Sequence, residues 1–79
     1  MKQEHIKEDV FIALRDQNMG SRARLHAVGL KSGERFNAFV TGFAIEQDVE
    51  QVHFTIPPDQ AERWVSLSDI DFIAVLPRP

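Results

Sequence analysis

The sequence predicts a mainly β fold, in which an N-terminal α-helix over about residues 5–18 precedes a strongly bent, five-stranded antiparallel barrel over about residues 22–77. From residue 22 onward, apolar residues recur with a period of two, in short runs that end at glycine, proline or polar residues. In the first two runs the apolar residues change parity at a glycine, Gly29 and then Gly42, which is typical of strands that bend at a bulge. A chain of 79 residues makes one small domain.

The N-terminal segment is predicted to be a short amphipathic helix. Its apolar residues recur at the spacing of one helix face, namely Ile6, Val10, Ala13 and Leu14. Acidic residues come early, where the helix dipole favours them, and Asn18 or Gly20 can end the helix. The alternative is a strand over Asp9–Arg15, because alternate residues there are also apolar and the Val-Phe-Ile string favours strands.

The rest of the chain is organised around a predicted hairpin, Leu25–Val40, whose turn is bracketed by Gly29 and Gly33. Its two strands supply apolar residues to the expected core: Val28, Leu30, Phe36, Ala38 and Val40. An isolated hairpin is only marginally stable in water, so the other elements must cover and close it.

Three further strands are predicted after the hairpin. Past Gly42 the second strand continues, with Phe43 and Ile45 as its expected core residues. The later strands are expected at Val49–Ile56, Arg63–Leu67 and Ile70–Leu76, and prolines at 57, 58 and 77 stop two of them.

Charge is distributed unevenly along the chain, although the net charge is only −3. Residues 22–35 carry four cationic side chains and one acid, and the cations are Arg22, Arg24, Lys31 and Arg35. Residues 36–79 carry seven acids and two arginines. The basic stretch is interpreted either as the solvated face of a strand or as a nucleic-acid contact. The chain has no cysteine, no apolar run that could span a bilayer and no signal-like N-terminus, so we expect a cytoplasmic protein without membrane contact.

No pattern in the sequence indicates catalysis. His5, His26 and His53 lie far apart and lack the close spacing of a zinc-binding pair, so neither a metal nor a cofactor is predicted. Trp64 is out of phase with the apolar residues of its strand, and such an exposed aromatic either stacks on a base or fills a subunit interface. We expect the interface.

Several strings resemble the Sm-like family, and within it the bacterial RNA chaperones of the Hfq type. Glu8–Arg15 resembles the N-terminal helix of these chaperones, and Leu30–Ala38 resembles the Sm hairpin, with Ala38 where a glycine is usual. Ile70–Pro79 resembles the last strand with its proline stop. The resemblance covers most of the chain. It implies a homo-oligomeric ring of five to seven subunits that binds single-stranded RNA rich in uridine or adenosine.

The resemblance also implies candidate RNA-binding residues. Leu30 and Arg35 match positions that line the adenosine-binding surface, and Phe43 matches an aromatic near the uridine pocket. Together with the other cations of the hairpin, the candidates are Arg22, Arg24, Leu30, Lys31, Arg35 and Phe43. The uridine pocket departs from the family pattern, because Leu67-Ser68 stands where these chaperones carry Lys-His and Glu46 stands where the base-stacking aromatic is expected.

The proposed ring would join the exposed edges of the fourth and fifth strands, since an open barrel leaves their backbone groups without partners. The candidate interface residues lie on these two strands: Trp64, Val65, Leu67, Phe72, Ile73 and Val75. The chain also resembles, more distantly, the Rho-binding antiterminator family, whose small acidic barrels bind a protein instead of RNA. The acidic C-terminal half suits this alternative, a non-enzymatic adaptor that binds a protein.

Overall fold

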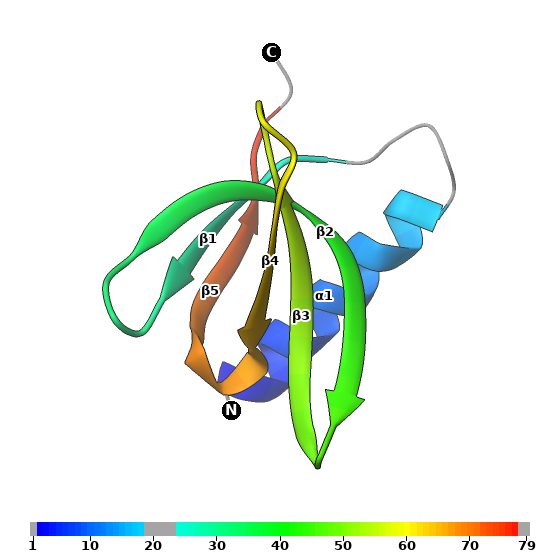
Figure 1. The fold of residues 1–79 in the computed structure, drawn as a ribbon, viewed down its shortest axis with the longest axis vertical. Coiled ribbons are helices and arrows are strands. Elements are labelled where there is room, and N and C mark those ends of the chain that lie inside the picture. Colours follow the sequence, from blue (N-terminus) through cyan, green and yellow to red (C-terminus); the bar gives the residue numbers. More distant parts are fainter. Residues whose placement is uncertain (1, 19–23, 78–79) are drawn as a thin grey trace.

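The computed structural model describes residues 2–18 and 24–77, with the side chains of residues 5–15 and 24–77, and it confirms the predicted fold class (Figure 1). The elements, in chain order, are α1 (Lys2–Asn18), β1 (His26–Leu30), β2 (Arg35–Glu46), β3 (Val49–Ile56), β4 (Ala61–Ser66), the 3₁₀ turn η1 (Leu67–Asp69) and β5 (Ile70–Val75). The strands form one antiparallel sheet in the order β4-β3-β2-β1-β5. The two edges are therefore β4 and β5, as the sequence predicts.

Strand β2 is long enough to serve both halves of the curved sheet. Its first part pairs with β1 as far as Ala38, and its second part pairs with β3 from Phe39 onward. The register with β3 shifts between Val40 and Gly42, so the predicted bend near Gly42 is confirmed. In Figure 1 this strand arches across the molecule, and the curvature lets one sheet enclose a core.

A second irregularity occurs at Gly29, also as predicted. The register between β1 and β5 shifts between Gly29 and Leu30, and the Phe72 ring of β5 lies against the glycine. A Cβ at position 29 would lie only 2.1 Å from Phe72 Cε1. Glycine is therefore needed here because the neighbouring ring occupies the space of a side chain.

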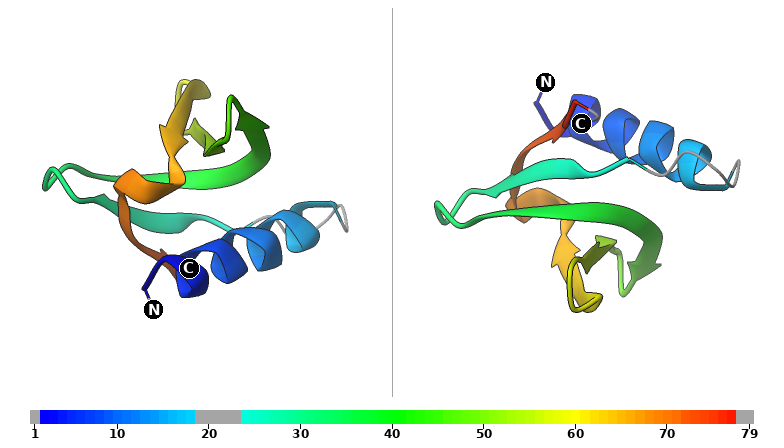
Figure 2. Two further views of the ribbon diagram at one scale, coloured as in Figure 1. Left: turned by 90° about the horizontal axis from the view of Figure 1, so that it is seen from below. Right: turned by 90° about the horizontal axis from the view of Figure 1, so that it is seen from above.

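Helix α1 covers one side of the curved sheet, where it contacts β2, β5 and η1 (Figure 2). The helix interpretation of the N-terminal segment is thus confirmed over the strand alternative. The core joins buried side chains of the helix to those of all five strands and η1: Ile6, Val10, Ala13, Val28, Leu30, Ala38, Val40, Val52, Phe54, Val65, Leu67, Ile70 and Ile73. Among the described residues, no helix combines the length and apolar character needed to cross a membrane.

Three details differ from the sequence prediction. Ile45 is exposed instead of buried, because it lies near the tip of the β2–β3 hairpin. Strand β4 begins and ends earlier than predicted, and Leu67 belongs to η1, which turns its side chain into the core. Strand β5 ends at Val75, and despite its apolar composition it buries only Ile70 and Ile73 fully.

We expect Gly29→Ala to destabilise the protein by about 1–3 kcal/mol, because the added methyl group must displace the Phe72 ring. Chemical denaturation gives the free energy of unfolding. The matched test is the same substitution in a Phe72→Ala background, where the space is free and the cost should be much smaller. An equal cost in both backgrounds would show that the ring is not the reason for the glycine.

Candidate functional site

A groove lies at the end of the barrel where α1, the β2–β3 turn and η1 meet, and we call it the acidic groove. Its volume is about 400 Å³. The residues that line it come from α1, the β2–β3 turn, the start of β3, the end of β4 and η1: Lys7, Asp48, Val49, Glu50, Ser66, Leu67 and Ser68. The turn holds Gln47 and Asp48 at φ values of 51° and 65°, the left-handed conformation of a tight two-residue hairpin turn. This backbone places the Asp48 carboxylate at the rim of the groove.

The electrostatic character of the acidic groove is set by its carboxylates. Lys7 is the only cation among the described residues that line it, and its Nζ lies 2.5 Å from Glu50 Oε2. Its ammonium group also lies 5.9 Å from the centre of the Phe43 ring. Lys7 is thus already paired, and Asp48 is left as an exposed negative charge without a described partner.

Phe43, a candidate RNA-binding residue, is half-buried beside the helix. Its ring packs against Phe11 of α1, with 5.0 Å between the ring centres. With the Lys7 ammonium near the same ring, Phe43 has two contacts to α1. Phe43 therefore holds the helix to β2 in this structure.

The candidate RNA-binding cations of the first hairpin do not form one patch. Arg24 precedes β1 and donates a hydrogen bond of 3.1 Å from Nη2 to the carbonyl oxygen of Leu76. Lys31 and Arg35 lie at the opposite end of β1 and are exposed, with the Arg35 guanidinium 5.5 Å from the centre of the Phe72 ring. Leu30 is buried in the core, and Arg22 lies outside the described residues.

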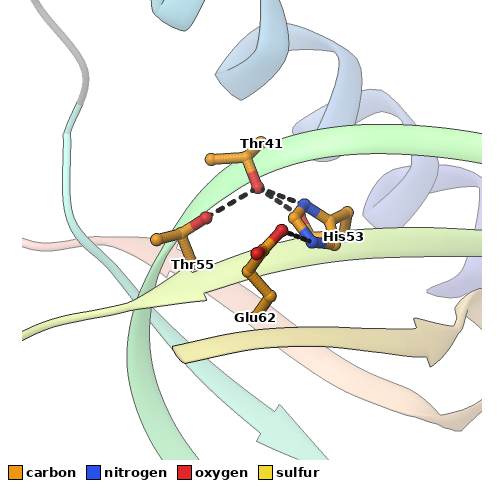
Figure 3. A network of polar contacts seen from close by, with 4 residues as sticks. All are labelled: Thr41, His53, Thr55 and Glu62. Carbon is orange, nitrogen blue, oxygen red and sulfur yellow. Dashed lines mark hydrogen bonds and ion pairs between the residues drawn. The ribbon is translucent and has the colours of Figure 1, made fainter. Parts of the chain in front are cut away.

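A polar network crosses the outer face of β2, β3 and β4 (Figure 3). Thr41 Oγ1 lies 2.6 Å from His53 Nδ1 and 3.1 Å from the Thr55 hydroxyl, while Glu62 Oε1 lies 3.1 Å from His53 Nε2. The Trp64 ring packs on the same imidazole, with 4.8 Å between ring centres. A hydroxyl–imidazole–carboxylate sequence is the order of a catalytic triad. Here the Thr41 hydroxyl is shared among three partners on β3, and the third is the His53 carbonyl at 3.3 Å. The network therefore ties β2 to β3, and through Glu62 it ties β3 to β4.

Sequence reasoning missed this network because it depends on the bulge in β2. The pairing of β2 with β3 brings Gly42 opposite His53 and leaves Thr41 without a partner residue in the ladder. A Cβ at Gly42 would lie 3.2 Å from the His53 Cβ, so a side chain here would fit only if the neighbouring atoms moved by a few tenths of an ångström. The sequence does contain one indication of the network, namely two outward-facing polar residues on β3, His53 and Thr55, opposite the bend at Gly42 of β2.

The candidate interface residues divide into two groups. Val65, Leu67 and Ile73 are buried in the core of the single chain, so their side chains do not reach the strand edges. Phe72 is half-buried, whereas Trp64 and Val75 are 52% and 50% exposed on β4 and β5. Only these last three side chains are available to a neighbouring molecule.

An ion pair joins the β1–β2 turn to the edge strand β4. Arg63 donates two hydrogen bonds to the Glu34 carboxylate, of 2.5 Å and 2.9 Å, and its guanidinium lies 5.1 Å from the centre of the Phe36 ring. Hydrogen bonding to Arg63 lowers the pKa of Glu34 below its usual value, and the same bond raises the pKa of Arg63. The pair therefore fixes one end of β4, although both groups are partly exposed to solvent.

These features lie at one end of the barrel and along its two edges. The acidic groove carries the exposed Asp48 carboxylate, and β4 and β5 each have one side without a partner strand among the described residues. No family model, curated protein or solved structure matches the chain.

We expect Glu34→Gln to lower the free energy of unfolding near neutral pH, because it removes the charge that Arg63 binds. The pKa of Glu34 is lowered in the folded state, so its stabilising effect is present above about pH 4.5 and is lost as the pH falls through the lowered pKa. The difference between parent and variant should therefore shrink in acid. Denaturant unfolding over a pH series measures it, with Glu46→Gln as the control, and a difference that persists in acid would contradict the ion-pair explanation.

Proposed function

We propose that this chain is a non-enzymatic Sm-like adaptor, which binds a protein partner through its acidic groove in the manner of the Rho-binding antiterminators. The observation that carries the proposal is the charge of the groove. Asp48 and Glu50 line it, and its described cation, Lys7, is paired with Glu50. The partner that fits this surface presents a lysine- or arginine-rich segment.

The same charges disfavour RNA in this groove. Phosphate binding depends on cations that replace counterions, and the groove offers one lysine that is already engaged. Leu67 and Ser68 occupy the place of the chaperones' Lys-His pair, and Leu67 is buried. Stacking on Phe43 would require the ring to leave its contact with Phe11. An RNA strand in this groove would therefore meet carboxylates, without the cations that neutralise phosphates or an aromatic ring that is open for stacking.

A second candidate function is that of an RNA-binding ring, and two observations favour it. The edge strands β4 and β5 can pair between copies, as the Sm-like resemblance implies. Lys31 and Arg35 are both exposed beside the β1–β2 turn, and neither lines the acidic groove. In this alternative the RNA contacts the turn side of the ring.

Binding measurements distinguish the two candidates. For the adaptor we expect the protein to bind purified bacterial Rho, and we expect Asp48→Asn to weaken this binding by about tenfold, since asparagine tolerates the positive φ but removes the charge. Asp59→Asn, on the exposed β3–β4 loop, is the control with the same change of charge. Tight binding of oligo-U or oligo-A at low salt, weakened by Lys31→Ala and Arg35→Ala, would overturn the adaptor in favour of the ring.

The ring is tested separately by light scattering. If β5 pairs with β4 of a neighbour, Val75→Lys should reduce the mass to that of one chain, because a charge then faces the neighbouring strand. Val49→Lys is a matched control, since Val49 is 43% exposed but lies on the inner strand β3, where it pairs with Glu46 of β2. Ile73→Lys does not test the ring, because Ile73 is buried in the core and a lysine there would destabilise the single chain itself. A parent protein with the mass of one chain would exclude the ring.

A further inference from the structure

Helix α1 has an outer face that the described part of the chain leaves largely exposed, although the Phe11 ring at its margin also packs against Phe43. Phe11 and Ile12 on this face are 46% and 42% exposed, and Glu8 and Arg15 beside them are also exposed. A shallow hollow of about 440 Å³ lies over these side chains and Lys7. We call Glu8, Phe11, Ile12 and Arg15 the helix patch.

The helix patch lies opposite the buried face of the helix. With about 100° per residue, Glu8 and Arg15 lie about 10° on either side of one line along the helix, and Phe11 and Ile12 lie about 50° on either side of it. The buried residues Ile6, Val10 and Ala13 lie about 150–170° from the same line. The patch is therefore centred on the part of the helix that points away from the core.

We propose that the helix patch is a self-association surface, on which α1 of a second copy packs antiparallel about a two-fold axis. The axis passes between Phe11 and Ile12. Residues then lie at the same position along the paired helices when their numbers sum to 23, so Glu8, close to the facing line, meets Arg15 of the other copy. Phe11 and Ile12 lie on opposite sides of that line, so each packs against its own counterpart. Both ion pairs form at once because the arrangement is symmetric.

Charge complementarity is the reason to choose a second copy over a different protein. Glu8 and Arg15 are about 10 Å apart along their own helix, which is too far for an ion pair within one chain. Among the side chains that the structure describes, neither has an ion-pair partner. The antiparallel copy supplies an opposite charge to each of them and covers both exposed apolar side chains.

The contact is small, so we expect a weak pair. Two exposed apolar side chains per copy fall well below the roughly 800 Å² per partner of a standard interface. A dissociation constant of about 0.1–1 mM is expected, and the interface becomes important where the local concentration of the protein is high.

Charge reversal with reconstitution tests the proposal. Sedimentation of the parent should show the average particle mass rising toward twice its starting value as the concentration approaches about 1 mM. Glu8→Arg and Arg15→Glu should each weaken the doubling at least about tenfold, because each creates two like-charge contacts in the symmetric pair. An equimolar mixture of the two variants should restore it, since every contact is then between opposite charges. The double variant Glu8→Arg/Arg15→Glu should restore it as well.

The control is Glu46→Arg, an exposed acid outside the patch that undergoes the same change of charge. It should leave the doubling unchanged. Restoration by mixing cannot be explained by a folding defect in either variant. The proposal is overturned if the parent shows no doubling up to about 1 mM, or if the mixture associates no better than the separate variants.

Discussion

The bend of β2 is the constraint on which the other elements depend. One strand pairs with β1 in its first part and with β3 in its second, so the sheet can close over a core only if this strand curves sharply. Gly42 suits the bend because a Cβ at this position would lie only 3.2 Å from the His53 Cβ of the neighbouring strand. The bulge leaves Thr41 free to bond His53 and Thr55, and these bonds fix the bend from outside.

Helix α1 completes a core that the curved sheet leaves open on one side. Val10 is fully buried, and complete burial of a valine contributes roughly 1.5–3 kcal/mol, which is large for a domain of this size. The helix is therefore part of the folded unit. Because its inner face is committed to the core, only its outer face and its contacts at the rim of the barrel are available for recognition.

Local patterns in the sequence were sufficient to predict the helix, the five strands and both bends, since hydrophobic period and glycine position are properties of short segments. The surface could not be predicted in the same way. Leu67 was expected at a strand edge, but η1 turns it inward, and the composition of the strand gives no sign of that turn. The acidic groove joins Lys7 to Glu50 and Ser66, and their meeting depends on how α1 crosses the barrel.

The number of cationic residues in the sequence overstates how many are free to bind a partner, because three of them make contacts that hold the fold together. Lys7 binds Glu50, Arg24 binds the Leu76 carbonyl and Arg63 binds Glu34. Lys7 has a further consequence, since it lines both the acidic groove and the hollow over the helix patch. The ammonium group of Lys7 is held on the groove side by Glu50 and by the face of the Phe43 ring. The same side chain therefore ties the helix to both β2 and β3.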